Sequence, residues 1–109
     1  MDYHYDRAYY RLVYPMALRP QLRTGNQAFE VMDLSEQGVR FRHPGPARPA
    51  VGTKVAGTLR LPTGEVLEIE GAVVRVEAPG VSVALSKGVP FGIMIEQQRF
   101  IGQRRFTTL

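Results

Sequence analysis

Apolar and polar residues alternate in short runs along most of this chain, and Gly and Pro interrupt the runs. Side chains alternate between the two faces of a strand, so this pattern predicts an all-β fold. Turn residues are concentrated at 24–26 and 62–64, and a proline-rich loop is expected at 43–52. The runs predict strands at 16–22, 28–33, 39–41, 54–61, 66–77, 81–85 and 91–95.

The longest of these runs changes its alternation partway along. Leu67 and Ile69 alternate with glutamates, whereas Val74 and Val76 take the opposite parity, so we expect a bend or bulge near Gly71. Segment 97–106 has no strand pattern and predicts a short C-terminal helix, buried through Phe100 and Ile101. Six or seven antiparallel strands and one helix are most simply arranged as a small closed or nearly closed barrel.

Composition limits the chemistry that this chain can carry. A length of 109 residues is typical of one domain, and the absence of cysteine excludes disulfides and thiolate metal sites. The two histidines, His4 and His43, have no partner at ligand spacing, so no metal is expected. No apolar run is long enough to span a bilayer, and the polar start is unlike a secretory signal. We therefore expect a cytoplasmic protein with no membrane insertion.

The formal net charge is +4, and its source is mainly arginine. Lys54 and Lys87 are the only lysines among the 14 basic residues. Arginine suits planar, two-point recognition of phosphate and of base edges. An arginine-rich genome of high GC content explains the bias as a whole at least as well, and the charge alone would suit any acidic partner.

Two short motifs indicate which kind of ligand the arginines bind. Arg7 and Arg11 form an RxxxR, while Asp33, Ser35 and Gly38 form a DxSxxG. Guanidinium forks bind phosphate and the O6/N7 edge of guanine, and a carboxylate accepts from the N1–H and N2–H₂ edge. Together the motifs favour a guanine nucleotide as ligand.

Each motif alone is weak evidence. The RxxxR spacing recurs between Arg19 and Arg23, and an Asp and a Ser followed by Gly at the end of a strand is common turn chemistry. Their conjunction is far more specific, because the first motif lies before the first expected strand and Asp33 ends the second.

With both motifs in this order, the chain resembles the PilZ domain family, receptors for the bacterial messenger cyclic di-GMP. The likeness covers almost the whole sequence. Its matching segments are 6–15, 31–41, 71–76 and 91–95. The resemblance implies a six-stranded antiparallel split barrel with a helix over one end. It also implies a flexible arm at 1–15 carrying RxxxR and a barrel with its helix at 16–109.

The resemblance also implies roles for the motif residues. Arg7 and Arg11 would hold phosphates and guanine edges, while Asp33 and Ser35 would bond one guanine from the barrel side. Gly38 would leave room for the ligand to approach the backbone, since glycine has no Cβ.

One departure from the family concerns Asp6. Many members have a third arginine there, which favours a stacked pair of ligands, and an acid would repel the phosphates of a second ligand. We therefore expect one cyclic di-GMP per protomer. Besides Asp6, possible additional ligand contacts are Tyr10, Arg40 and Arg75.

The function predicted from the sequence is a binding module. The arm would become ordered over cyclic di-GMP and so pass the signal to an unidentified protein partner. One alternative is an adaptor of the same family that binds protein without the ligand. The other is a small barrel that binds single-stranded nucleic acid, although we expect neither DNA nor RNA as partner. No nucleophile–base pair or paired carboxylates suggest an enzyme, and no cofactor is expected.

Overall fold

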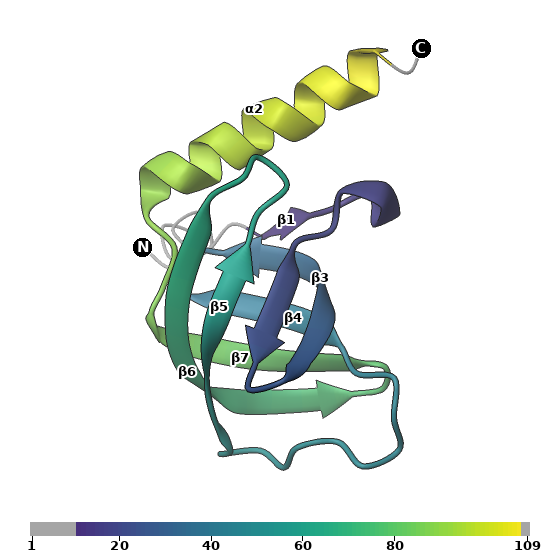
Figure 1. The fold of residues 1–109 in the computed structure, drawn as a ribbon, viewed down its shortest axis with the longest axis vertical. Helices are drawn as coiled ribbons and strands as arrows, with labels where there is room; N and C mark the ends of the chain where they lie inside the picture. The colour runs from purple at the N-terminus through teal and green to yellow at the C-terminus, as the bar shows by residue number, and fades with distance from the viewer. Residues whose placement is uncertain (1–10, 108–109) are drawn as a thin grey trace, which may run out of the picture.

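The computed structural model describes residues 11–107, with side chains up to Arg104, and shows a closed barrel of six antiparallel strands capped by one helix (Figure 1). The predicted fold class is thereby confirmed. The elements in chain order are β1 (Leu12–Val13), η1 (Met16–Leu18), β2 (Gln21–Thr24), β3 (Gln27–Ser35), β4 (Gly38–Arg42), β5 (Lys54–Arg60), β6 (Val66–Glu77), β7 (Gly80–Lys87) and α2 (Phe91–Thr107).

The barrel closes through neighbouring pairs in the order β2-β3-β4-β7-β6-β5, with β5 pairing back to β2. Closure leaves no free edge among these six strands. The short β1 is a seventh strand, added to the sheet by pairing with β3. Inward side chains of the strands form one apolar core, with Leu22, Leu34 and Leu59 fully buried at its centre.

The first expected strand, at 16–22, is wrong in its first half. Residues Met16–Leu18 form a 3-10 turn, in which the amide of Leu18 donates to the carbonyl of Pro15 at 2.9 Å. Prolines flank this turn on both sides, and a proline cannot donate to a strand ladder. The strand therefore begins only after Pro20, whose carbonyl accepts from the amide of Val31 at 2.9 Å.

The expected strand at 91–95 is also wrong, because helix α2 already begins at Phe91. The carbonyl of Pro90 accepts from the amides of Ile93 and Met94, which starts the helix six residues earlier than predicted. Met94, Gln97 and Ile101 are buried at helical spacing. A short apolar run fits either period, and here the helical one prevails because β7 already completes the barrel.

The bend predicted in the long strand is present, but the apolar alternation changes face at Val74 and not at Gly71. The register between β6 and β7 shifts at Glu70/Gly71 and again at Val73/Arg75. Val73 is buried, and Val74 is the extra residue at the second shift, with 54% of its surface exposed. At Gly71, a Cβ would overlap the backbone carbonyl of Ala84, so β7 can approach only a glycine there.

Two consecutive side-chain hydrogen bonds, one of them buried, join the segment after β1 to the helix and to the turn before β6. Tyr14 donates its hydroxyl to Oε1 of Gln97 at 2.8 Å, and Nε2 of Gln97 donates to Oγ1 of Thr63 at 2.6 Å. Gln97 is fully buried, and Thr63 lies in the turn between β5 and β6. Helix α2 is thus fastened over this end of the barrel by polar contacts as well as by its apolar face (Figure 1).

Substituting Tyr14→Phe should lower the free energy of unfolding by about 1–3 kcal/mol, because Oε1 of Gln97 would stay buried without its donor. Urea denaturation of parent and variant measures the difference. The double variant Tyr14→Phe, Gln97→Leu is the matched control, since removing both partners should recover part of the loss. A Tyr14→Phe protein as stable as the parent would contradict this account of the helix attachment.

Candidate ligand-binding site

A β-bulge turns the acidic motif toward the outside of the barrel. On β3, Val31 pairs with Phe41 of β4, yet Asp33 pairs with Arg40, so Met32 is an extra residue. Val31 faces the core and, beyond the bulge, Leu34 does so instead. The change of parity carries Asp33 to the outer face, and bulges commonly re-aim side chains in this way.

Ser35 and Gly38 lie opposite each other where a two-residue turn joins β3 to β4. A Cβ at Gly38 would lie 3.2 Å from Oγ of Ser35 and 3.6 Å from the carbonyl oxygen of Val83. A larger residue at position 38 would therefore crowd the Ser35 hydroxyl.

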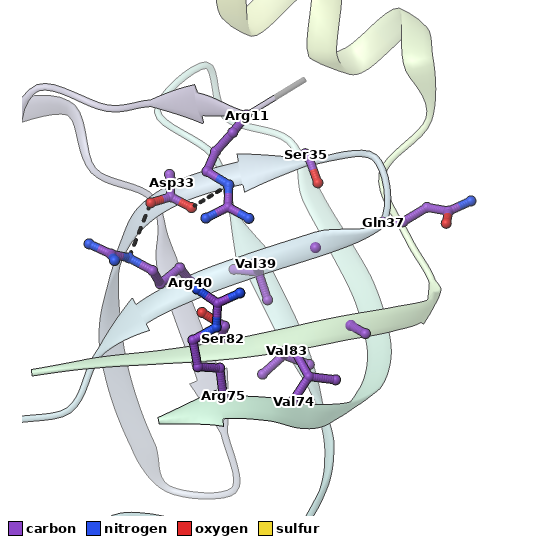
Figure 2. A pocket seen from close by; sticks show the side chains of 12 residues that line it. Arg11, Asp33, Ser35, Gln37, Val39, Arg40, Val74, Arg75, Ser82 and Val83 are labelled. Atoms are coloured by element: carbon purple, nitrogen blue, oxygen red, sulfur yellow. Dashed lines mark ion pairs between the residues drawn. The ribbon is translucent and has the colours of Figure 1, made fainter. Parts of the chain in front are cut away.

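The outer faces of β3, β4, β6 and β7 form a shallow cavity of about 290 Å³ together with Arg11 (Figure 2). Of the sequence-predicted site residues, the structure brings together Arg11, Asp33, Ser35, Gly38, Arg40 and Arg75. The remaining predicted residues, Asp6, Arg7 and Tyr10, lie outside the part of the chain that the structure describes. Of the arm expected at 1–15, the described residues include β1, which is paired with β3.

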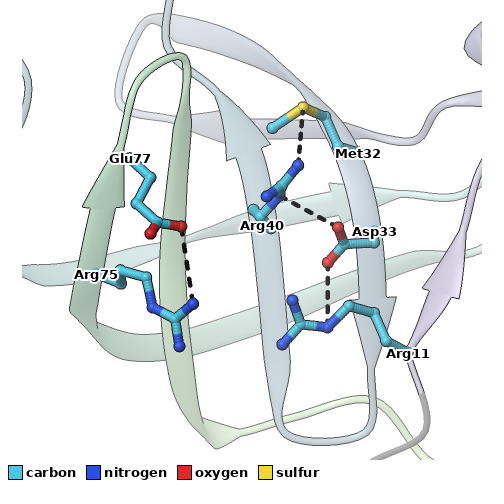
Figure 3. Close-up of polar contacts among 6 residues, drawn as sticks. All are labelled: Arg11, Met32, Asp33, Arg40, Arg75 and Glu77. Carbon is cyan, nitrogen blue, oxygen red and sulfur yellow. Dashed lines mark hydrogen bonds and ion pairs between the residues drawn. The ribbon is translucent and has the colours of Figure 1, made fainter.

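Two arginines from different segments converge on the Asp33 carboxylate (Figure 3). Nε of Arg11 lies 3.5 Å from Oδ1, and Nε of Arg40 lies 3.2 Å from Oδ2. The Arg40 contact is an ion pair without the alignment of a hydrogen bond. Only 9% of the Asp33 side chain is exposed, against 56% for Arg11, so the carboxylate is fixed while Arg11 borders solvent.

The pKa of Asp33 is raised above its usual range. Burial is the dominant cause, and the positive charges of Arg11 and Arg40 oppose it without cancelling it. The site therefore holds a carboxylate that is poorly hydrated and has cations on both sides. Such a group accepts hydrogen bonds strongly from a ligand that offers N–H donors.

Arg75 borders the same cavity from β6 and is largely exposed. Its Nη1 lies 3.7 Å from Oε1 of Glu77, in an ion pair whose partners are both open to solvent (Figure 3). Exposed pairs of this kind contribute little to stability, so the guanidinium can exchange this carboxylate for an anion on a ligand at small cost.

Sequence reasoning missed the pairing of Asp33 with Arg40 and the contribution of β7, where Ser82 and Val83 line the cavity. The pairing of Asp33 with Arg40 could have been found from the sequence. A two-residue turn pairs Ser35 with Gly38, and moving two residues further along each strand places Arg40 opposite Asp33. The contribution of β7 to the cavity follows only from the closure of the barrel.

The fold and site together define a small β-barrel domain with an arginine-lined cavity on its outer face. Residues 5–102 match the model of the PilZ domain family. The chain belongs to that family, as its motifs indicated. Neither the curated proteins nor the solved structures gave a match. PilZ domains are binding domains of the cyclic di-GMP or adaptor type and are not catalytic.

Two further observations concern the described residues alone. No helix among them is long and apolar enough to cross a bilayer. Within residues 11–107, no three His, Asp or Glu side chains are grouped so that they could hold a metal ion.

Replacing Asp33 with asparagine should not destabilise the protein at neutral pH. Because the folded-state pKa is raised above 3.8, the folded protein retains a proton that the unfolded chain has already lost. The free energy of unfolding of the parent therefore falls as the pH rises from the unfolded-state pKa to the folded-state pKa of Asp33. The Asp33→Asn variant has no carboxyl group at this position, so it does not show this fall. We expect the variant to be at least as stable as the parent at about pH 7, with a smaller advantage at about pH 3.

Urea denaturation at the two pH values tests this expectation. Glu30→Gln is a matched control, because Glu30 forms an exposed ion pair with Arg19, and its loss should change stability by no more than about 0.5 kcal/mol. An Asp33→Asn protein clearly less stable than the parent at neutral pH would mean that the two ion pairs outweigh the burial of the carboxylate.

Proposed function

We propose that this PilZ domain binds cyclic di-GMP at the cavity between Arg11 and Arg75. The observation that carries the proposal is that one arginine of the first motif lies beside the second motif, although the two are distant in sequence. Arg11 of the RxxxR and Asp33, Ser35 and Gly38 of the DxSxxG all border one cavity. Either motif could arise by chance, but their convergence around one cavity with two more arginines supports a shared anionic ligand.

In the proposed complex, Asp33 accepts from the N1–H and N2–H₂ groups of one guanine, and Ser35 adds a hydroxyl contact beside it. The carboxylate has lone pairs to spare, because each of its oxygens has a single arginine partner. Arg40 stays in place and keeps Asp33 oriented. Arg11 leaves its 3.5 Å contact and turns, together with Arg7, to the phosphates. Arg75 supplies a further cation at the opposite wall.

The signal would pass outward through the segment that carries Arg11. That segment continues into β1 and then to Tyr14, whose hydroxyl bonds Gln97 in helix α2. Ordering of the segment before β1 over the ligand would therefore affect the attachment of the helix as well as the surface around the cavity. We propose that a protein partner recognises this change.

Removing the Arg11 guanidinium should weaken cyclic di-GMP binding by at least about 100-fold, because a charged, two-point contact would be lost. Calorimetric titration measures this directly, with GTP and cyclic GMP as specificity controls. Arg60→Ala is the matched control, since Arg60 is exposed on β5 and does not border the cavity. Equal affinities of parent and Arg11→Ala would refute the proposed site, and a parent that binds no ligand would favour the ligand-independent adaptor.

The same titration should give a stoichiometry of one cyclic di-GMP per protomer. The reason is Asp6, which stands where the family often has a third arginine and which would repel a second ligand. Asp6→Arg is the complementary variant, and we expect its stoichiometry to rise toward two. A parent stoichiometry near two would show that the acid does not limit binding to one ligand.

A further inference from the structure

A second cavity, of about 370 Å³, lies at the end of the barrel where β4 runs into the loop before β5. It shares no lining residue with the site above. Phe29, on its wall, lies four residues before Asp33 on β3, a separation of roughly 13 Å along the strand. Figure 1 shows the loop between β4 and β5 passing beneath the end of the barrel away from α2. Barrel mouths are frequent ligand sites, and this volume is in the usual range.

One wall of this cavity is aromatic. The rings of Phe29 and Phe41 have centroids 5.0 Å apart, and the ring of His43 stacks on Phe29 with centroids 5.3 Å apart and planes 24° from parallel. Phe41 is buried in the core, whereas Phe29 and His43 are half-buried and border the cavity. Strand β3 and the residue that follows β4 therefore hold a stacked pair of aromatic rings on this wall, and such rings favour contact with a planar ligand.

The other side of the cavity is cationic. Arg48 and Lys54 both line it, and its lining contains no Asp or Glu. Nε of Arg48 is buried and has no hydrogen-bond acceptor within residues 11–107. Among the ion pairs of those residues, none includes Arg48 or Lys54. Arg19 and Arg40 also have a buried Nε without an acceptor, but each of them forms an ion pair. Within residues 11–107, Arg48 has neither an acceptor at Nε nor an ion pair, and it lies with a second positive charge, Lys54, on the wall of a cavity.

From this juxtaposition we propose that the mouth of the barrel is a second binding site, for a small planar organic carboxylate. The ring of the ligand lies against Phe29 and His43, while its carboxylate bonds Arg48 and Lys54. Inorganic phosphate matches the cations but not the aromatic wall, where it would lose hydration without gaining contacts. A neutral aromatic compound matches the wall but leaves both cations unpaired. The proposal is independent of cyclic di-GMP binding, because the two cavities have no residue in common.

The experiment uses the whole ¹⁵N-labelled chain and follows backbone amide shifts during titration with benzoate. Benzamide, which lacks the charge, and acetate, which lacks the ring, are the matched ligand controls. We expect saturable shifts at the amides of His43, Arg48 and Lys54, with no shifts at Asp33. Benzoate should bind at least fivefold more tightly than either control.

Two arginine variants make the result specific. Arg48→Ala, and independently Arg48→Gln, should weaken benzoate binding at least fivefold, whereas Arg60→Ala, at the far end of β5, should leave it unchanged. The amide spectrum of each variant shows directly that the barrel is folded. Shifts that do not saturate, benzamide binding equal to benzoate, shifts centred on Asp33, or unchanged affinity in folded Arg48 variants would each overturn the proposal.

Discussion

The site depends on one constraint, which is that a carboxylate must stay ionised while nearly buried on the wall of the barrel. The extra residue Met32 turns Asp33 outward, at a position where it pairs with Val13 of β1 on one side and Arg40 of β4 on the other. Burial raises the pKa of Asp33, and Arg11 and Arg40 compensate in part. The barrel thus bears a local cost for a carboxylate that is largely removed from water.

Much of the barrel could be predicted from the sequence because its strands and turns are specified by residues close together along the chain. Strands β5 and β6 are marked by alternating residues, and turns are marked at Gly25 and at Gly64, where positive φ angles favour glycine. Pairing between strands that follow each other in sequence is set by the turns that join them. The motifs could be predicted for a similar reason, since the short turn after Ser35 fixes which residues lie opposite.

The errors arose where local pattern and three-dimensional closure disagree. Residues 91–95 alternate like a strand, yet β7 already closes the barrel, and Met94 and Gln97 pack on its end as a helix. Val74 follows an apolar alternation and still faces outward, because β6 gains a residue relative to β7. Neither result can be read from periodicity, since the first depends on closure of the barrel through β4 and β7 and the second on the register between β6 and β7.

Intermolecular nuclear Overhauser effects between the isotope-labelled chain and unlabelled cyclic di-GMP test the central claim most directly, because they locate the ligand on the protein. The account predicts that one bound ligand gives cross-peaks to Arg11 and also to Ser35 and Gly38 across the cavity. Cross-peaks confined to one motif, or found at the aromatic mouth of the barrel, would contradict it.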